Sequence, residues 1–296
     1  MFFLWTGGKK PFKPGNTQPC GRVRRHTPLY YDPSRCIDAI ASLVNAGESA
    51  DRLAERQSRT ALEREIKPTT RNVQNLALPS DDVLSWTEAT ELLDTFEIDV
   101  HPTVLATDVS EAVEAATDFG FPVVLKIDSR DVPHRTDADA VRVEVDNTGA
   151  VKNAYETIIA NTRKYAPDAR IEGILVQPHI EDGVEALVGA TRDDVFGPVV
   201  TVGSGGVSVE LYDDTAVRIA PLSNADAHDA VLTTTLAEQL NGHRSEPSRD
   251  LATLTSLINR VGRLATVVDD VAEVDLNPVI VQENDISVVD VLVKTN

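Results

Sequence analysis

The C-terminal end of the chain sets the strongest limit on its fold. Residues 273–281 and 286–293 are two apolar runs rich in Val and Ile, and the turn-prone segment 282–285 separates them. Runs of this length around a short polar turn predict a β-hairpin. Asp and Asn are poor strand formers, so those inside these runs need an explanation.

Three side chains of this hairpin form a candidate metal site. Asp275 and Asn277 share one strand face because side chains alternate, and a turn centred on residues 283–284 places Asp290 opposite Asn277. Oxygen atoms converging from neighbouring strands suit Mg²⁺ when nucleotide phosphates complete its octahedron. Alternatively, these three side chains bind no metal and form the polar, solvent-facing side of a hairpin at the edge of a sheet.

Helix and strand signals alternate upstream of the hairpin, and they predict one continuous α+β unit over residues 80–296. Ser85 and Glu88 match a capping box before a helix ending near Phe96, and Gly120 stands where a helix from Ser110 should end. Further helices are expected at 151–165, 225–240 and 250–268, and strands at 121–127, 141–145, 174–177 and 185–189. Residues 198–211 are expected to form a strand, a loop and a second strand.

The N-terminal part differs in composition. Residues 1–26 have many Gly and Pro and no sustained periodicity, so we expect disorder there. Residues 27–57 contain apolar positions at helical spacing, and the polar residues 58–79 are expected to be a linker.

Charge and composition exclude several functions. The net charge is −19, because residues 1–75 hold 13 Lys and Arg against 7 Asp and Glu while the remainder holds 15 against 40. Such an acidic surface repels phosphates, so nucleic-acid and membrane-surface partners are excluded, and no apolar run is long enough to span a bilayer. The acid excess with few Lys suits concentrated salt. Cys20 and Cys36 provide no disulfide framework or cysteine metal site, and we expect a cytoplasmic protein.

Two features could bind phosphate. Gly203-Ser-Gly205-Gly206 allows close backbone approach to an anion, with Arg218 downstream as a countercharge, although a tight hairpin would also explain the glycines. Lys126 near the end of an apolar strand could meet a phosphate as a point charge, or it could be an edge lysine that reaches solvent.

His134 lies in the charged loop 131–137, which follows a strand. An exposed imidazole there could accept a phosphoryl group, whereas a buried one would satisfy a core hydrogen bond. The other five histidines share no metal-binding spacing.

Several short segments, in a fixed order, carry a family resemblance over residues 80–296. They are 123–126, 131–137, 189–193 with 196–198, 203–210, 218–222 and Asp-Leu-Asn-Pro at 275–278. Together they resemble the ATP-grasp nucleotide domain of ADP-forming acyl-CoA synthetases. This family is also called acetate–CoA ligase (ADP-forming) and is related to succinyl-CoA synthetase.

The resemblance implies an ATP-grasp fold of two α/β subdomains that binds ADP or ATP with Mg²⁺. In the family, a phosphoryl group passes from an acyl phosphate to a histidine on the ligase part, and a loop of the grasp domain carries it to ADP. The resemblance puts His134 on that loop as the catalytic residue. Phosphoryl transfer asks a protein chiefly for positioning and charge neutralisation.

The resemblance also assigns the binding residues. Asn277 and Asp290, with Asp275 beside them, would hold the metal. The implied nucleotide-binding residues are Lys126, Gln177, Ile180, Glu185, Gly203, Gly205, Gly206 and Arg218.

Residues 27–57 resemble the tail of the ligase domain that precedes this module in fused members, so the chain is expected to begin inside a larger enzyme. The phosphorylatable histidine of the ligase part and the CoA-binding part would then come from a partner subunit or domain.

Some positions depart from the family. Asp139-Ala140 replaces Gly-Gly and would put a carboxylate near phosphate oxygens, and Pro178 replaces a Glu at the hinge. The alternative function is therefore a non-catalytic remnant that folds and binds nucleotide weakly or binds a partner protein. A chain like the succinyl-CoA synthetase β subunit would carry a complete Gly-rich loop, which this sequence lacks.

Overall fold

The computed structural model describes residues 3–4, 29–30, 78–79, 83–206, 214–242 and 247–296, and the chain divides into the units Met1–Lys67 and Pro68–Asn296. In the first unit, β1 (Phe3–Leu4) pairs in parallel with β2 (Leu29–Tyr30). The other predictions for residues 1–26, 27–57 and 58–79 fall almost entirely outside the described residues.

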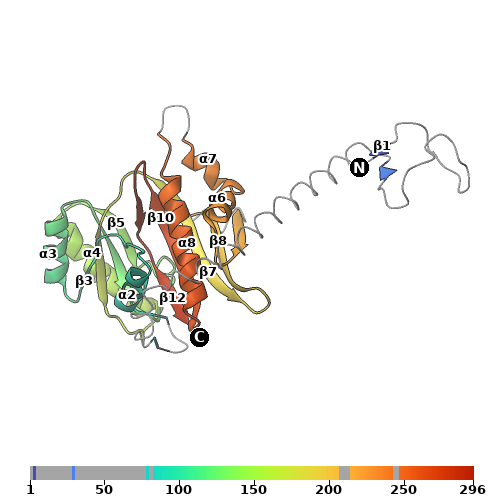
Figure 1. Ribbon diagram of the computed structural model, residues 1–296. Coiled ribbons are helices and arrows are strands. Elements are labelled where there is room, and N and C mark those ends of the chain that lie inside the picture. Colours follow the sequence, from blue (N-terminus) through green and yellow to red (C-terminus); the bar gives the residue numbers. More distant parts are fainter. Residues whose placement is uncertain (1–2, 5–28, 31–77, 80–82, 207–213, 243–246) are drawn as a thin grey trace, which may run out of the picture. The chain divides into compact units, whose positions relative to one another are not determined.

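The second unit contains a smaller antiparallel sheet. Its strand order is β3 (Val104–Ala106), β6 (Gly173–Pro178), β4 (Val123–Asp128) and β5 (Val141–Val145). Helices α3 (Val109–Phe119) and α4 (Thr148–Tyr165) pack against each other and against this sheet (Figure 1). All six residues of β4 are buried, because β4 has neighbours on both sides and helices above it.

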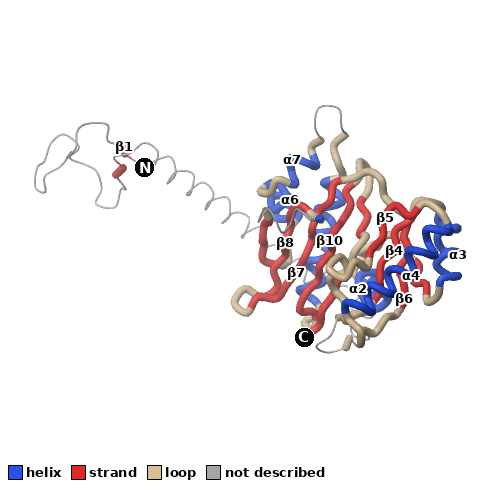
Figure 2. Tube along the Cα trace, turned by 180° about the vertical axis from the view of Figure 1, so that it is seen from behind, coloured by secondary structure: helices blue, strands red, loops and turns tan. Residues whose placement is uncertain are grey.

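A larger sheet occupies the rest of the unit. Its order is β11 (Ile286–Val288), β10 (Val271–Val281), β7 (Val184–Asp193), β8 (Gly197–Ser204) and β9 (Thr215–Ile219), and β12 (Leu292–Thr295) also pairs with β10. Helix α8 (Leu251–Val267) covers one face, and Figure 2 shows the sheet from its other side. Helix α2 (Trp86–Thr95) belongs to the same core and begins with the expected Ser85–Glu88 capping box.

The predicted C-terminal hairpin is confirmed, with its turn between Val281 and Ile286. Val279 pairs with Val288 on one side of a gap, and Asp275 pairs with Leu292 on the other. The same register continues across the gap, so residues 277 and 290 stand opposite each other. The second predicted strand is thus split into β11 and β12.

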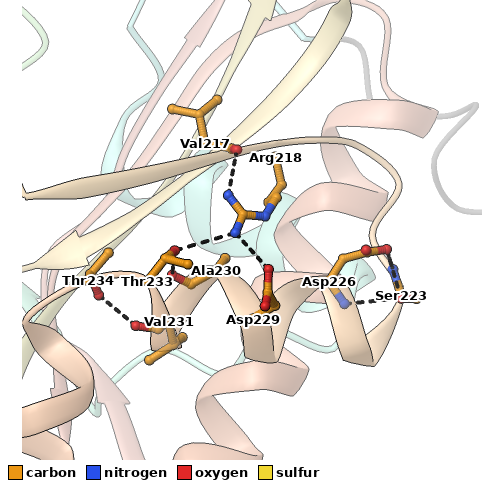
Figure 3. Close-up of polar contacts among 9 residues, drawn as sticks. All are labelled: Val217, Arg218, Ser223, Asp226, Asp229, Ala230, Val231, Thr233 and Thr234. Carbon is orange, nitrogen blue, oxygen red and sulfur yellow. Dashed lines mark hydrogen bonds and ion pairs between the residues drawn. The ribbon is translucent and has the colours of Figure 1, made fainter. Parts of the chain in front are cut away.

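The helix expected over residues 225–240 is also split. It forms α6 (Asn224–Leu232) and α7 (Leu236–Leu240), with three consecutive threonines between them. The hydroxyls of Thr233 and Thr234 donate to the backbone carbonyls of Ala230 and Val231, both at 2.8 Å (Figure 3). Such side-chain bonds compete with the helical pattern, and β-branching weakens it further.

The first strand of the 198–211 prediction is β8. The second predicted strand falls on residues 207–213, which lie outside the described part of the chain, and the next described strand is β9 (Thr215–Ile219). Two separate apolar clusters form the cores, one under each sheet. Among the described residues, no helix is both long and apolar enough to cross a membrane.

Candidate functional site

Lys126 and Gln177 lie on neighbouring strands of the smaller sheet and donate to the same backbone oxygen. The Lys126 Nζ atom lies 2.9 Å, and the Gln177 Nε2 atom 3.1 Å, from the carbonyl oxygen of Val289 in the gap between β11 and β12. The Gln177 amide also donates to the Thr103 hydroxyl at 2.8 Å. Only 6% of Lys126 is exposed, and β4 is an interior strand, so Lys126 is not an edge lysine reaching solvent.

Asp290 receives positive charge from two directions. The Arg135 guanidinium donates to its Oδ1 atom and, through Nε, to the Ile127 carbonyl at 2.8 Å. Burial by itself would raise the pKa of Asp290, but the charges of Arg135 and Lys126 outweigh it and hold the pKa below the ordinary value. Burial lowers the pKa of Lys126, and the carboxylate of Asp290 opposes that shift. Asp290 is therefore the charge partner of two cations.

The loop between β4 and β5 carries His134 at the surface, so this imidazole is not a core residue. Asp131, at the start of the loop, accepts hydrogen bonds from the backbone and the guanidinium of Arg170 at 2.7 and 3.0 Å. These bonds lower the pKa of Asp131. The loop therefore presents an exposed imidazole, and its first residue is held in place by Arg170.

Asp139 fixes the other end of the loop. Its carboxylate accepts from Arg142 at 2.8 and 2.9 Å and from the Asn161 amide at 2.8 Å. The hydrogen bonds from Arg142 hold the pKa of Asp139 below its ordinary value. Arg142 thus offsets the negative charge of Asp139, while the placement of this carboxylate near phosphate oxygens stays a prediction. Its backbone keeps the positive φ, 49°, that a glycine would favour.

The glycine segment 203–206 contacts the C-terminal hairpin through Gly206. The Gly206 backbone N–H donates to the Asn277 side-chain oxygen at 3.0 Å. Gly206 has φ +65°, and a Cβ there would lie 1.8 Å from Oε2 of Glu185, so Glu185 lies beside the same turn. By contrast, the atom nearest to a Cβ at Gly203 would be the Asp214 carbonyl oxygen at 2.6 Å, and at Gly205 the Ala186 carbonyl oxygen at 2.7 Å. Close approach of the neighbouring strands β9 and β7 therefore accounts for Gly203 and Gly205.

Asp275 has excess negative charge around it. Burial, with the charges of Glu273 and Asp290, raises its pKa to about 6, while His134 and Lys294 act in the opposite direction. A divalent cation would relieve this repulsion, and the carboxylates of Asp275 and Asp290 and the amide oxygen of Asn277 are the hard donors that Mg²⁺ prefers.

Two carboxylates and one amide supply only part of the coordination shell of Mg²⁺. Within the described part of the chain, no three His, Cys, Asp or Glu side chains are grouped as a metal site. The donor set fits a cation that phosphate oxygens and water help to hold.

Arg218 points away from these groups. Strand register aligns Arg218 with Val200, Val200 with Ala190 and Ala190 with Val274. Val274 is buried and precedes Asp275, so Arg218 lies on the sheet face opposite to Asp275.

On that face, the Arg218 guanidinium pairs with Asp229 of α6 at 3.0 Å and lies 3.4 Å from the Thr233 hydroxyl (Figure 3). The geometry gives no support to a phosphate role for Arg218.

The hinge region after β6 combines predicted and unexpected residues. The carbonyl of Pro178 contacts the His101 ring at 3.1 Å, and Ile180 follows two residues later, half-buried, before β7. The sequence patterns did not single out Arg135 or Val289. Arg135 could have been found because it adjoins His134. Val289 could not, because any residue type provides a backbone carbonyl.

Comparison with known proteins identifies the class. The family model for the ATP-grasp domain matches residues 77–295. The chain belongs to the ATP-grasp domain family, and the predicted fold, two α/β subdomains of an α+β protein, is confirmed.

The relatives define the branch of the family. The chain is 36% identical over 264 residues to acetate–CoA ligase (ADP-forming) I of Archaeoglobus fulgidus, covering 89% of this chain and 38% of that protein. It is 34% identical to the β subunit of acetate–CoA ligase (ADP-forming) I of Pyrococcus furiosus, covering 69% and 88%. The chain is therefore a close homologue of these β subunits, although it spans well under half of the fused relative.

Solved structures agree. Two structures of the dinucleotide-forming acetyl-coenzyme A synthetase 1 of Ca. Korarchaeum cryptofilum match with TM-scores of 0.69 and 0.61, at 39% and 34% identity. The matches cover 73% and 77% of this chain and 94% and 97% of theirs. The first contains coenzyme A and Ca-AMPCP. The second contains coenzyme A and Mg-AMPPCP, with its phosphohistidine segment pointing towards the nucleotide-binding site.

Proposed function

We propose that this chain is the nucleotide- and Mg²⁺-binding part of an ADP-forming acyl-CoA ligase of the acetate–CoA ligase type, and that it transfers a phosphoryl group between His134 and ADP. The homology to ADP-forming β subunits is the observation that carries this proposal. The exposed His134 loop, joined through Arg135 to Asp290, supports it, because the loop lies beside the candidate cation ligands.

The transfer itself is a displacement at phosphorus. The phosphorus–nitrogen bond to His134 breaks as a terminal oxygen of ADP forms the new phosphorus–oxygen bond, and the imidazole leaves with its nitrogen lone pair. Lys126 would neutralise phosphate charge, and Glu185 with the segment 177–180 would border the nucleotide. Mg²⁺, held by Asn277, Asp290 and Asp275, would supply further charge neutralisation.

A separate CoA-binding and ligase part is included in the proposal. The chain spans 38% of the fused Archaeoglobus enzyme but 88% of the Pyrococcus β subunit, which belongs to a two-subunit enzyme by its name. The match to the fused enzyme includes 264 residues, more than residues 77–295 contain. This supports the assignment of residues 27–57 to the tail of a preceding ligase domain.

The reverse reaction tests His134 without the partner. Incubation with Mg·ATP labelled at the γ-phosphate should transfer label to the protein in an acid-labile, base-stable form. His134→Gln should abolish the label. His228→Gln is the matched control, because His228 is also exposed but lies on α6. Label that persists in His134→Gln would contradict the assigned residue.

The alternative, a remnant that folds and binds nucleotide weakly or a partner protein, is separated by calorimetry. Binding of Mg·ADP without any transfer of label would favour the remnant. No detectable heat up to millimolar Mg·ADP would contradict nucleotide binding altogether.

A further inference from the structure

Arg135 connects its own loop and the neighbouring end of β4 to the distant C-terminal segment. Its Nε atom donates to the carbonyl of Ile127 on β4 at 2.8 Å, and its Nη1 atom donates to Oδ1 of Asp290 in the C-terminal segment. Only 12% of its side chain is exposed. The residue before it, His134, is exposed, so the buried guanidinium determines where the exposed imidazole is held.

Two hydrogen bonds to the Asp290 carboxylate end on the same oxygen. Its Oδ1 atom already accepts the Val291 backbone N–H at 3.0 Å as well as the guanidinium. The Lys126 ammonium lowers the pKa of Asp290 by its charge and donates to the Val289 carbonyl. A metal ion bound to Oδ1 would therefore have to displace the guanidinium, which is held there by a charge-assisted hydrogen bond.

We propose that Arg135 is a positioning residue that competes with the divalent cation for Asp290. Without a cation, the ion pair holds the His134 loop on the C-terminal segment. When Mg²⁺ binds with the nucleotide, it displaces the guanidinium and releases the centre of the loop. The inference rests on the proposed function, because it uses the assignment of a cation to Asp290.

The two ends of the loop limit what is released. Asp131 is held by Arg170 and Asp139 by Arg142 and Asn161, and none of these bonds involves Asp290. Val132 and Ala138 are also buried in the core under the smaller sheet, so loss of the Arg135–Asp290 contact frees only residues 133–137 between them. The movement stays local and carries His134.

The test measures binding of Mn²⁺, as a substitute for Mg²⁺, in the presence of ADP by electron paramagnetic resonance. Arg135→Gln should bind Mn²⁺ about tenfold more tightly than the unmodified chain, because a charge-assisted competitor is removed. Arg135→Lys keeps the positive charge but lacks the planar guanidinium, so its Mn²⁺ affinity should lie between those of Arg135→Gln and the unmodified chain. Arg142→Gln is the control, since it removes a guanidinium beside the same loop but not from Asp290.

Hydrogen exchange provides a second readout that is independent of activity. In the unmodified chain with ADP, Mg²⁺ should accelerate amide exchange in residues 134–137. In Arg135→Gln, exchange should already be fast without Mg²⁺. A thermal unfolding midpoint close to that of the unmodified chain shows that Arg135→Gln has folded.

The outcomes separate the two proposals. Equal Mn²⁺ affinity in the unmodified chain, Arg135→Gln and Arg135→Lys would overturn the competition and leave the proposed function intact. Weaker binding in Arg135→Gln would also overturn it, by making Arg135 a supporting residue. Absence of Mn²⁺ and ADP binding from all variants would overturn the proposed function as well.

Discussion

Two of the arginine–aspartate pairs in and around the larger sheet differ in what they connect. Arg135 and Asp290 are 155 positions apart and join a surface loop to the C-terminal segment. Arg218 and Asp229 are 11 positions apart and join an edge strand to the helix that covers it (Figure 3). The first pair is the more enclosed, with side chains 12% and 24% exposed, against 28% and 33% for the second.

The difference shows that an arginine's role follows from the sheet face it occupies. Arg218 is aligned with Val274 on the helix-covered face, where an aspartate of α6 satisfies it. Arg135 reaches the side that holds Asp275, Asn277 and Asp290. The following predictions test this contrast, beginning with the largest expected effect.

Asp290→Ala should have the largest effect. It leaves the Lys126 ammonium and the Arg135 guanidinium without their shared counter-charge, which should lower the free energy of unfolding by about 3 kcal/mol. It should also abolish Mn²⁺ binding with ADP. Urea unfolding and electron paramagnetic resonance measure the two effects. Glu283→Ala, exposed in the hairpin turn, is the control and should change neither.

Gly206→Ala should have the next largest effect. A non-glycine residue at φ +65° costs about 1–2 kcal/mol, and here the added Cβ also displaces the Glu185 carboxylate. Nucleotide affinity, measured by calorimetry with Mg·ADP, should fall with stability. Gly197→Ala has a similar φ, +72°, with open space around the Cβ, so it should lower stability alone. Equal nucleotide affinity in both variants would contradict a place for Gly206 in the site.

Asp229→Ala tests the second ion pair. Both partners are partly exposed, so the free energy of unfolding should fall by less than about 1 kcal/mol, and Mn²⁺ binding should stay unchanged. The measurements are those used for Asp290→Ala. A loss of nucleotide binding as large as that of Asp290→Ala would restore a role for Arg218 at the phosphates.

The smallest effect is a pH dependence at the base of the His134 loop. Hydrogen bonds from Arg170 lower the pKa of Asp131 in the folded chain below its ordinary value of 3.8. A lowered folded pKa gives a stabilising contribution that is present above the unfolded value and is lost as pH falls through the folded value. The stability difference between the unmodified chain and Asp131→Asn should therefore be small at pH 7 and vanish near pH 2. A difference that grows on acidification would contradict it.

The sequence patterns predicted local structure well where that structure depends on residues close together in the chain. The Ser85 capping box, the turn between Val281 and Ile286 and the register that places Asp290 opposite Asn277 all appear in the structure. Each depends on neighbours in the chain or on strand alternation, which a sequence shows directly.

Contacts between distant segments could not be predicted in the same way. The pairing of Arg135 with Asp290 depends on how a loop of one sheet meets the edge of another, and the hydrogen bond to Asp139 from Asn161 comes from a helix residue 22 positions away. The break at Thr233–Thr235 was visible as three β-branched residues, but the apolar helical spacing on both sides concealed it.

The carbonyl of Val289 has a consequence for how the two sheets can move. Lys126 and Gln177 both donate to this one oxygen, so a movement of the smaller sheet away from the C-terminal segment must break both bonds together. Because the acceptor belongs to the main chain, replacing the valine side chain leaves the joint in place, and position 289 can drift in evolution without loosening it.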